Sequence, residues 1–241
     1  MEKLKLRLLH IYPKMLNLYG DFGNILTLKK RMEWRGFELE VLDLDYGGKI
    51  VPCDMYFLGG GQDTQQELAS VELLKNKDFL NEETENNKVF LGICGGYQLM
   101  GEYYQTPEGE QIQGVQMLDI HTISSNKRLI GNVTAKTDFL EPKTLVGFEN
   151  HGGRTWLGEN VKPLGLIEKG FGNNGEDKTE GARYRNVFGT YLHGSLLPKN
   201  PHFADYLLAA ALFNKYGENE LPPLNDNIEF KTHNFLRRYD G

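Results

Sequence analysis

The chain has 241 residues, of which 39% are hydrophobic and 25% are charged, a composition typical of a folded globular protein. Its net charge is −6 and no run of Lys and Arg is interleaved with aromatic residues, so the sequence does not favour nucleic acid as a partner. We expect one large α/β domain over 1–241, in which segment 221–241 forms a helix or a loose tail.

The sequence does not predict a membrane span or a disulfide framework. The longest apolar stretch, 206–213, is far shorter than the roughly 20 residues that a membrane-spanning helix needs. The leucines that alternate with basic residues near the start suit a half-buried strand better than a signal peptide, so a cytoplasmic location is expected. Two cysteines, Cys53 and Cys94, are too few for a multi-cysteine metal site, and no metal is expected.

Strand-like and helix-like periodicities alternate along the first hundred residues. The predicted strands cover 6–11, 38–44, 54–58 and 88–93. Helices are predicted over 23–35, from the capping-box pair Thr64 and Glu67 onward, and over 96–100. This alternation predicts a three-layer α/β fold with a mostly parallel central sheet flanked by helices. Shorter strands are expected at 129–134, 144–148, 164–168 and 186–192, before a clear helix at 202–216.

Glycines surround Cys94 in Gly92-Ile93-Cys94-Gly95-Gly96, where a buried-type strand passes into a helix. A nucleophile on such a turn is exposed at the end of a sheet, and the following helix N-terminus favours the thiolate. The N–H of Gly95 is a predicted oxyanion donor, and Gly60 in the loop 59–61 is a second. A buried inert thiol would not need this glycine pattern. Cys53 lacks such a turn and is predicted to be a structural or surface thiol.

A cysteine nucleophile also needs a base that takes its proton and returns one to the leaving amine. Two of the six histidines follow strand-like runs and precede glycines: His193 in 188–194 and His151 in 148–154. Position alone does not separate these two. The other four histidines are predicted to be packed or surface residues: His10, His121, His202 and His233.

The residues around Cys94, Gln98 and His193 resemble the class I glutamine amidotransferases, which carry a Gly-x-Cys-x-Gly-x-Gln elbow and a histidine far downstream. The segment Phe188-Gly189-Thr190-Tyr191-Leu192-His193-Gly194 is similar to the histidine motif of the cobyric acid synthase-like branch. This resemblance implies a flavodoxin-like fold and His193 as the base. Most members with a full triad carry a glutamate two residues after the histidine, where this chain has Ser195, so the third residue stays open.

A closer resemblance covers nearly the whole chain, through segments 16–24, 59–63, 93–98, 146–154 and 172–174. These segments look like the glutaminase subunits of the two-subunit lipid II isoglutaminyl synthases. The resemblance implies that the chain frees ammonia from L-glutamine and forms a heterodimer with a MurT-like Mur ligase subunit. That partner would use ATP and Mg to convert the D-glutamate α-carboxylate of lipid II to D-isoglutamine.

The same resemblance implies roles for individual side chains. Arg128 would bind the α-carboxylate of glutamine, which suits a fork-shaped cation, and Gln98 would belong to the substrate site. Once His193 is the base, His151 is a wall of the site or a packed residue. Asp21 is expected to be a turn residue or part of a partner-facing rim, the turn being favoured.

The chain itself is expected to hold no cofactor. It has no Gly-x-x-x-x-Gly-Lys-Ser/Thr phosphate loop, and the glycine-rich run 170–175 lacks the lysine of such a loop. Three alternatives remain at this stage. The chain could serve another synthetase of the cobyric acid synthase-like type, act as a stand-alone thiol hydrolase or peptidase, or be a non-catalytic binding protein with an amidotransferase fold.

Overall fold

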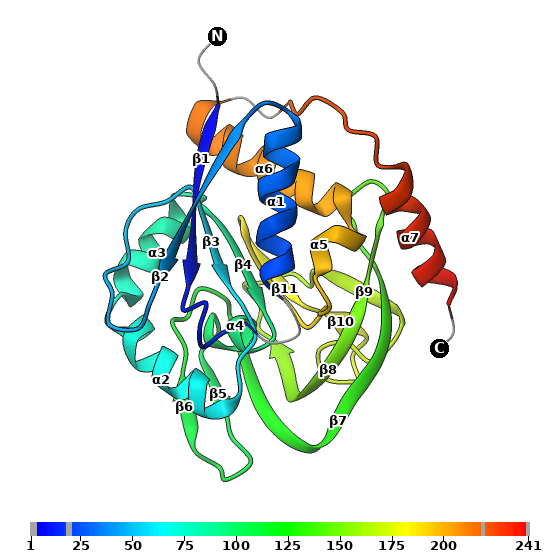
Figure 1. Ribbon diagram of the computed structural model, residues 1–241. Coiled ribbons are helices and arrows are strands. Elements are labelled where there is room, and N and C mark those ends of the chain that lie inside the picture. The colour runs from blue at the N-terminus through cyan, green and yellow to red at the C-terminus, as the bar shows by residue number, and fades with distance from the viewer. Residues whose placement is uncertain (1–3, 18–20, 218–219, 240–241) are drawn as a thin grey trace.

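A computed structural model describes residues 4–17, 21–217 and 220–239, and is built around a six-stranded central sheet (Figure 1). The strand order is β11-β12-β4-β3-β1-β2. All neighbouring strands are parallel except the edge pair β11 and β12. The strands are β1 (Lys5–Ile11), β2 (Glu38–Leu44), β3 (Met55–Leu58), β4 (Val89–Ile93), β11 (Ala182–Tyr184) and β12 (Val187–Thr190).

Helices cover both faces of this sheet (Figure 1). On one face lie α1 (Phe22–Trp34), α5 (Leu196–Lys199) and α6 (Pro201–Tyr216), and on the other lie α2 (Asp63–Leu74), α3 (Lys77–Glu85) and α4 (Gly95–Leu99). Successive strand residues point to opposite faces, so Leu8 belongs to the first core and Leu9 to the second. The predicted three-layer α/β class is confirmed.

A second sheet lies beside the carboxyl ends of the central strands (Figure 1). Its order is β10-β9-β7-β5-β6, and β8 pairs with β7 in a long antiparallel hairpin. The His193 N–H donates to the Phe148 carbonyl oxygen at 2.7 Å, which joins this hairpin to the segment after β12. The strands are β5 (Tyr103–Gln105), β6 (Gln111–Gln113), β7 (Ile120–Lys136), β8 (Thr144–Leu157), β9 (Gly165–Lys169) and β10 (Thr179–Glu180).

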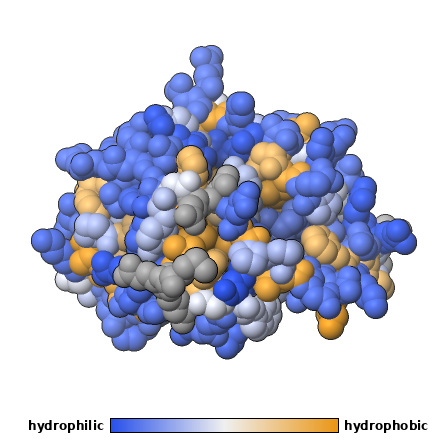
Figure 2. All heavy atoms as spheres, turned by 90° about the horizontal axis from the view of Figure 1, so that it is seen from above, coloured by the Kyte–Doolittle hydropathy of each residue, from blue (hydrophilic) through white to orange (hydrophobic). Residues whose placement is uncertain are grey.

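The described part of the C-terminal segment contains helix α7 (Asn227–Arg238). The fully buried Arg31 of α1 fixes the start of α7. Its guanidinium forms paired hydrogen bonds at 2.6–2.7 Å with Asp205 of α6 and with Asp226, the N-cap residue of α7. The surface at the amino ends of the central strands is mostly hydrophilic (Figure 2). Within the described ranges, no helix combines the length and apolar character needed to cross a membrane.

Several sequence predictions were wrong in detail. Helix α2 begins at Asp63, with Gln62 at its N-cap position and no side-chain cap, so Thr64 does not form the predicted capping box. Strands β7 and β8 are longer than the predicted 129–134 and 144–148. Consequently His151, which was expected to follow a strand, lies within β8, and Arg128 lies within β7.

Candidate active site

Cys94 occupies a strained turn between β4 and α4. Its backbone has φ 51° and ψ −105°, a conformation that residues other than glycine rarely adopt. A Cβ on Gly96 would lie 2.4 Å from the Leu58 carbonyl oxygen, so only glycine fits beside the neighbouring strand. Cys94 is half-buried at the carboxyl end of the sheet. This geometry is that of a nucleophile elbow.

His193 lies beside Cys94 because β4 and β12 are adjacent parallel strands. The Cys94 N–H donates to the Thr190 carbonyl oxygen at 2.9 Å, and the chain reaches His193 three residues later. Burial alone would lower the pKa of His193. The electrostatic interactions of the ring with Cys94 and Asp21 outweigh burial and raise this pKa above its usual value. The site therefore favours an imidazolium beside the sulfur.

A cavity of about 670 Å³ opens at Cys94. One side is formed by the start of α2 and the other by the β7–β8 hairpin, with Arg128, Gln98 and His151 in its lining. The Arg128 Nε donates to Asn150 Oδ1 at 2.8 Å, and its Nη2 donates to the Asn150 carbonyl oxygen at 2.7 Å. The structure thus brings Cys94 and Arg128 to one cavity, although carboxylate binding by Arg128 stays a prediction.

The predicted oxyanion donors lie close together. A Cβ on Gly95 would be 2.9 Å from the Gly61 backbone nitrogen, and one on Gly60 would be 3.3 Å from His193 Cε1 and 3.5 Å from the Cys94 Cβ. The Gly60 N–H, however, donates to Asp21 Oδ2 at 2.8 Å. Gly60 could stabilise an oxyanion only after releasing this contact, so its role and that of Gly95 stay predictions.

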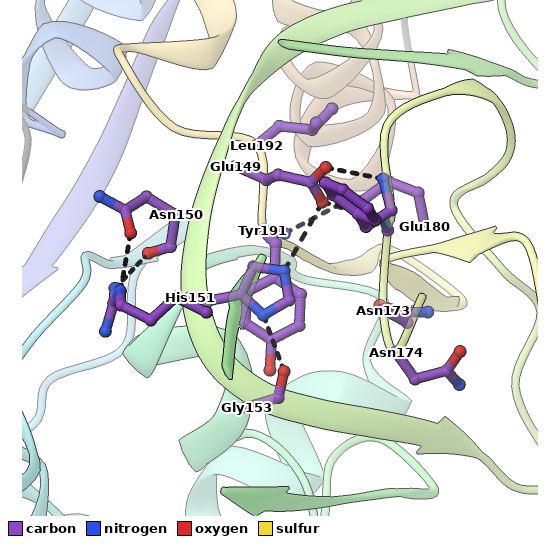
Figure 3. Close-up of polar contacts among 12 residues, drawn as sticks. Glu149, Asn150, His151, Gly153, Asn173, Asn174, Glu180, Tyr191 and Leu192 are labelled. Atoms are coloured by element: carbon purple, nitrogen blue, oxygen red, sulfur yellow. Dashed lines mark hydrogen bonds and ion pairs between the residues drawn. The ribbon is translucent and has the colours of Figure 1, made fainter. Parts of the chain in front are cut away.

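Gln98 and His151 both line the cavity, and Figure 3 shows the His151 ring lying against Tyr191. The Gln98 Nε2 donates to the Tyr191 hydroxyl at 3.0 Å, and the His151 ring stacks on Tyr191 with 3.6 Å between ring centroids. Burial lowers the pKa of His151, and His151 Nδ1 lies 2.8 Å from the Gly153 carbonyl oxygen. A buried, stacked and neutral imidazole is a wall residue, as predicted for His151 once His193 is the base.

Sequence reasoning missed the role of Glu149. This fully buried carboxylate accepts hydrogen bonds from the N–H groups of Phe171 and Gly172 at 2.7 and 2.8 Å. Figure 3 shows its carboxylate between that turn and the His151 ring, whose Nε2 lies 3.7 Å from Glu149 Oε2. The glycine-rich run 170–175 is therefore a turn held by a carboxylate.

Sequence reasoning also missed the position of Asp21. The residue is in the turn that begins α1, as predicted, but its side chain is fully buried and its Oδ1 lies 3.7 Å from His193 Nδ1. Residues 18–20 of the motif 16–24 lie outside the described residues. A local turn signal in the sequence gave no indication of this long-range contact.

Cys53 and the remaining histidines lie away from the cavity lining. Burial raises the pKa of the Cys53 thiol to about 11, so this cysteine is structural, as predicted. His10, His202 and His233 have pKa values lowered by burial. His121 is stacked between Tyr103 and Trp156. Among the described residues, no group of three or more His, Cys, Asp or Glu side chains is arranged to hold a metal ion.

Glu180 is a second buried acid near the site, and within the described residues it forms no ion pair. Its Oε1 accepts hydrogen bonds from the Thr190 hydroxyl at 2.6 Å and the Tyr191 N–H at 2.9 Å. Burial raises the pKa of Glu180 from 4.5 to about 7. Because the folded state holds this proton more tightly, its stabilising contribution is lost as the pH rises toward and through 7.

We expect the Glu180→Gln variant to avoid that loss. Between pH 4.5 and pH 8, the free energy of unfolding of the wild type should fall by about 3 kcal/mol relative to the variant, given the pKa change from 4.5 to about 7. Urea denaturation across this range measures the difference. Glu108→Gln, at an exposed turn, is the control and should run parallel to wild type. Parallel curves for Glu180→Gln would contradict a protonated Glu180 in the folded protein.

Comparison with known proteins agrees with this site. Residues 7–201 match the family described as the CobB/CobQ-like glutamine amidotransferase domain. The chain is 44% identical to the lipid II isoglutaminyl synthase (glutamine-hydrolyzing) subunit GatD of Staphylococcus aureus, over 96% of this chain and 95% of that protein. It is 38% identical to the GatD subunit of Streptococcus pneumoniae, over 92% and 86%.

A solved glutamine amidotransferase from Thermotoga maritima has the same fold. It superposes with a TM-score of 0.57 at 18% identity and covers 96% of this chain and 93% of its own. The predicted class I amidotransferase type of the fold is therefore confirmed. From the family match and the extent of both GatD similarities, the chain belongs to the CobB/CobQ-like glutamine amidotransferase family and is a GatD-type member of it.

Proposed function

We propose that this protein is the glutaminase subunit of a lipid II isoglutaminyl synthase. It hydrolyses L-glutamine and passes the ammonia to a MurT-type ligase, which amidates the D-glutamate α-carboxylate of lipid II to D-isoglutamine. The observation that carries the proposal is the strained Cys94 beside His193, in a cavity that also contains Arg128. ATP and Mg would be bound by the partner, and the heterodimer would act in the cytoplasm, in the part of peptidoglycan synthesis that takes place there.

The first chemical step is acyl transfer to sulfur. The Cys94 thiolate adds to the side-chain carboxamide carbon of glutamine, and the negative charge moves to the carboxamide oxygen. The Gly95 N–H, at the start of α4, is the candidate donor that would stabilise this oxyanion. The His193 imidazolium then gives its proton to the departing nitrogen, the C–N bond breaks, and ammonia leaves a thioester on Cys94.

The second step is hydrolysis of this thioester. His193, now neutral, takes a proton from water as the water adds to the thioester carbon. The C–S bond breaks and releases glutamate, whose new carboxyl proton passes to solvent. The proton retained by His193 leaves the imidazolium paired with the Cys94 thiolate, as at the start. Gln98 and His151 keep the far wall of the cavity fixed, since both contact Tyr191.

The proposal is tested by co-expressing the chain with a Mur ligase-like partner and purifying the pair. The amidation of a lipid II-type substrate is then measured with glutamine and, separately, with ammonium salt, each in the presence of ATP and Mg. Amidation from both nitrogen sources is the expected result. If the intact pair amidated the substrate from neither source, the specific assignment would fail. Amidation from ammonia alone by the wild-type pair would reject the glutaminase role.

A further inference from the structure

The carboxylate of Asp21 lies between the two parts of the catalytic machinery. Its Oδ2 accepts the Gly60 N–H at 2.8 Å, and its Oδ1 is 3.7 Å from His193 Nδ1, within ion-pair distance but longer than a hydrogen bond. The side chain has no exposed surface, and Oδ1 accepts no hydrogen bond from the described residues. A buried carboxylate in this state is stabilised by a nearby positive charge, which the His193 imidazolium supplies.

Asp21 reaches His193 from a different part of the chain than position 195, where members with a full triad carry a glutamate. Ser195, two residues after the histidine, is the N-cap residue of α5 and packs on the first turn of α1. A Cβ on Gly23 would lie only 2.2 Å from the Ser195 Oγ. Asp21, by contrast, follows β1, two strands away from β4 in the sheet order, and ends beside the imidazole.

We infer that Asp21 is the positioning carboxylate of His193, supplied by the loop after β1, and that the same side chain anchors the Gly60 loop. The inference rests on the proposed glutaminase chemistry for its meaning. The Asp21 carboxylate faces His193 Nδ1 and favours the proton on that nitrogen, which leaves Nε2 to take the thiol proton of Cys94. No bond to Asp21 is made or broken in the reaction.

Three further charged or titratable groups face His193. Cys94 approaches from the β4–α4 turn and shares its proton. Glu180 approaches from β10, but its Oε1 is bound to Thr190 and Tyr191. Lys199 of α5 has its Nζ 3.4 Å from the His193 carbonyl oxygen, and burial lowers the pKa of this lysine. Asp21 is the one of these four groups with a carboxylate oxygen at the imidazole nitrogen.

Through its two contacts, Asp21 connects the His193 base to the glycine loop 59–61. Because Asp21 holds the Gly60 N–H, the base and the loop share one anchor, and losing the carboxylate disturbs both. A Cβ on Gly60 would lie 3.3 Å from Asp21 Oδ2 and from His193 Cε1 and 3.5 Å from the Cys94 Cβ, so a side chain there would require these neighbours to shift by a few tenths of an ångström. The close packing of these four residues is the structural reason that a small displacement at Asp21 reaches the reacting atoms.

The first test measures the His193 imidazole directly, in the full chain without glutamine. Nitrogen NMR of histidine-labelled protein gives its pKa and neutral tautomer, in a Cys94→Ser background that removes the thiolate; His193→Gln identifies the signals. We expect neutral His193 to carry its proton on Nδ1, and Asp21→Asn to lower its pKa by about one unit, as expected for loss of a nearby opposite charge. Asp45→Asn, on an exposed carboxylate bound to Lys14, should leave the pKa unchanged.

If neutral His193 carried its proton on Nε2 in the Cys94→Ser protein that keeps Asp21, the inference would be overturned. An unchanged His193 pKa in folded Asp21→Asn would overturn it too. With the partner complex, Asp21→Asn should reduce kcat for glutamine hydrolysis at least about tenfold and leave KM nearly unchanged. If the wild-type complex released no ammonia from glutamine, the proposed function would fail, whereas the NMR result would still decide the contact between Asp21 and His193.

Discussion

The Cys94→Ala variant is expected to lose glutamine-dependent amidation while keeping ammonia-dependent amidation. The thiolate on the strained turn forms the acyl intermediate in the proposed mechanism, so glutamine hydrolysis should fall by at least about four orders of magnitude. The ligase partner can still use ammonia from added ammonium salt, because the substitution removes one sulfur atom and leaves the complex assembled. Both rates are measured on the same purified complex.

Cys53→Ala is the matched control for this variant. Cys53 is buried in the core on the α2 side of the sheet, and burial raises the pKa of its thiol to about 11. The control should keep both activities, with a modest loss of stability from the missing sulfur. Glutamine-dependent amidation by Cys94→Ala at a substantial fraction of the wild-type rate would show that another group attacks glutamine.

Replacing Arg128 by alanine is expected to weaken glutamine binding much more than it slows the reaction. The Arg128 guanidinium is held by Asn150 at the cavity that opens at Cys94. It is expected to bind the α-carboxylate of glutamine, whereas Cys94 attacks the carboxamide carbon at the other end of the substrate. A charged hydrogen bond contributes about 1.5–3 kcal/mol, so KM should rise roughly 10- to 100-fold with little change in kcat. Steady-state release of glutamate measures both constants.

Two variants sharpen the Arg128 result. Arg128→Lys should recover only part of the affinity, because a lysine cannot form the paired contact with a carboxylate. Lys127→Ala removes the neighbouring exposed charge and should leave KM near that of the wild type. An equal rise in KM for Lys127→Ala would indicate that the general positive charge of this loop, and not Arg128 itself, attracts glutamine.

The sequence was most informative where local pattern and tertiary structure agree. Predicted strand 38–44 matches β2 (Glu38–Leu44), and the elbow at Cys94 was predicted from glycines that the structure shows to be sterically required, as at Gly96. Alternating or continuous apolar residues mark a strand buried by helices, and this signal is contained in a few neighbouring positions. The central sheet and the glycine turn that carries Cys94 could therefore be predicted.

The β7–β8 hairpin could not be predicted to its full length, for a physical reason at each strand. Residues 124–128 of β7 are all polar and the pairing shifts register between Ser124 and Leu129, so periodicity is lost where the strand borders the cavity. In β8, Gly152 and Gly153 read as a loop. The structure instead uses Gly153 because a Cβ there would lie 2.5 Å from Gln98 Nε2.

The contact between Asp21 and His193 was also beyond reach of the sequence. The two residues belong to opposite ends of the chain, and they meet because parallel strands place their carboxyl ends on one edge of the sheet. The motif around Asp21 indicated only a turn. The family pattern directed attention to Ser195, whose side chain packs against α1. Only the strand order reveals which loops converge on the histidine.

The central claim is that Cys94 attacks glutamine, and a covalent adduct tests it most directly. The wild-type chain is treated with a diazo-ketone analogue of glutamine, and its intact mass and modified peptide are determined, with excess glutamine as competitor. We predict a single adduct on Cys94, protection by glutamine, and no modification of the buried Cys53. No adduct, or an adduct confined to Cys53, would contradict the assignment of Cys94 as the nucleophile.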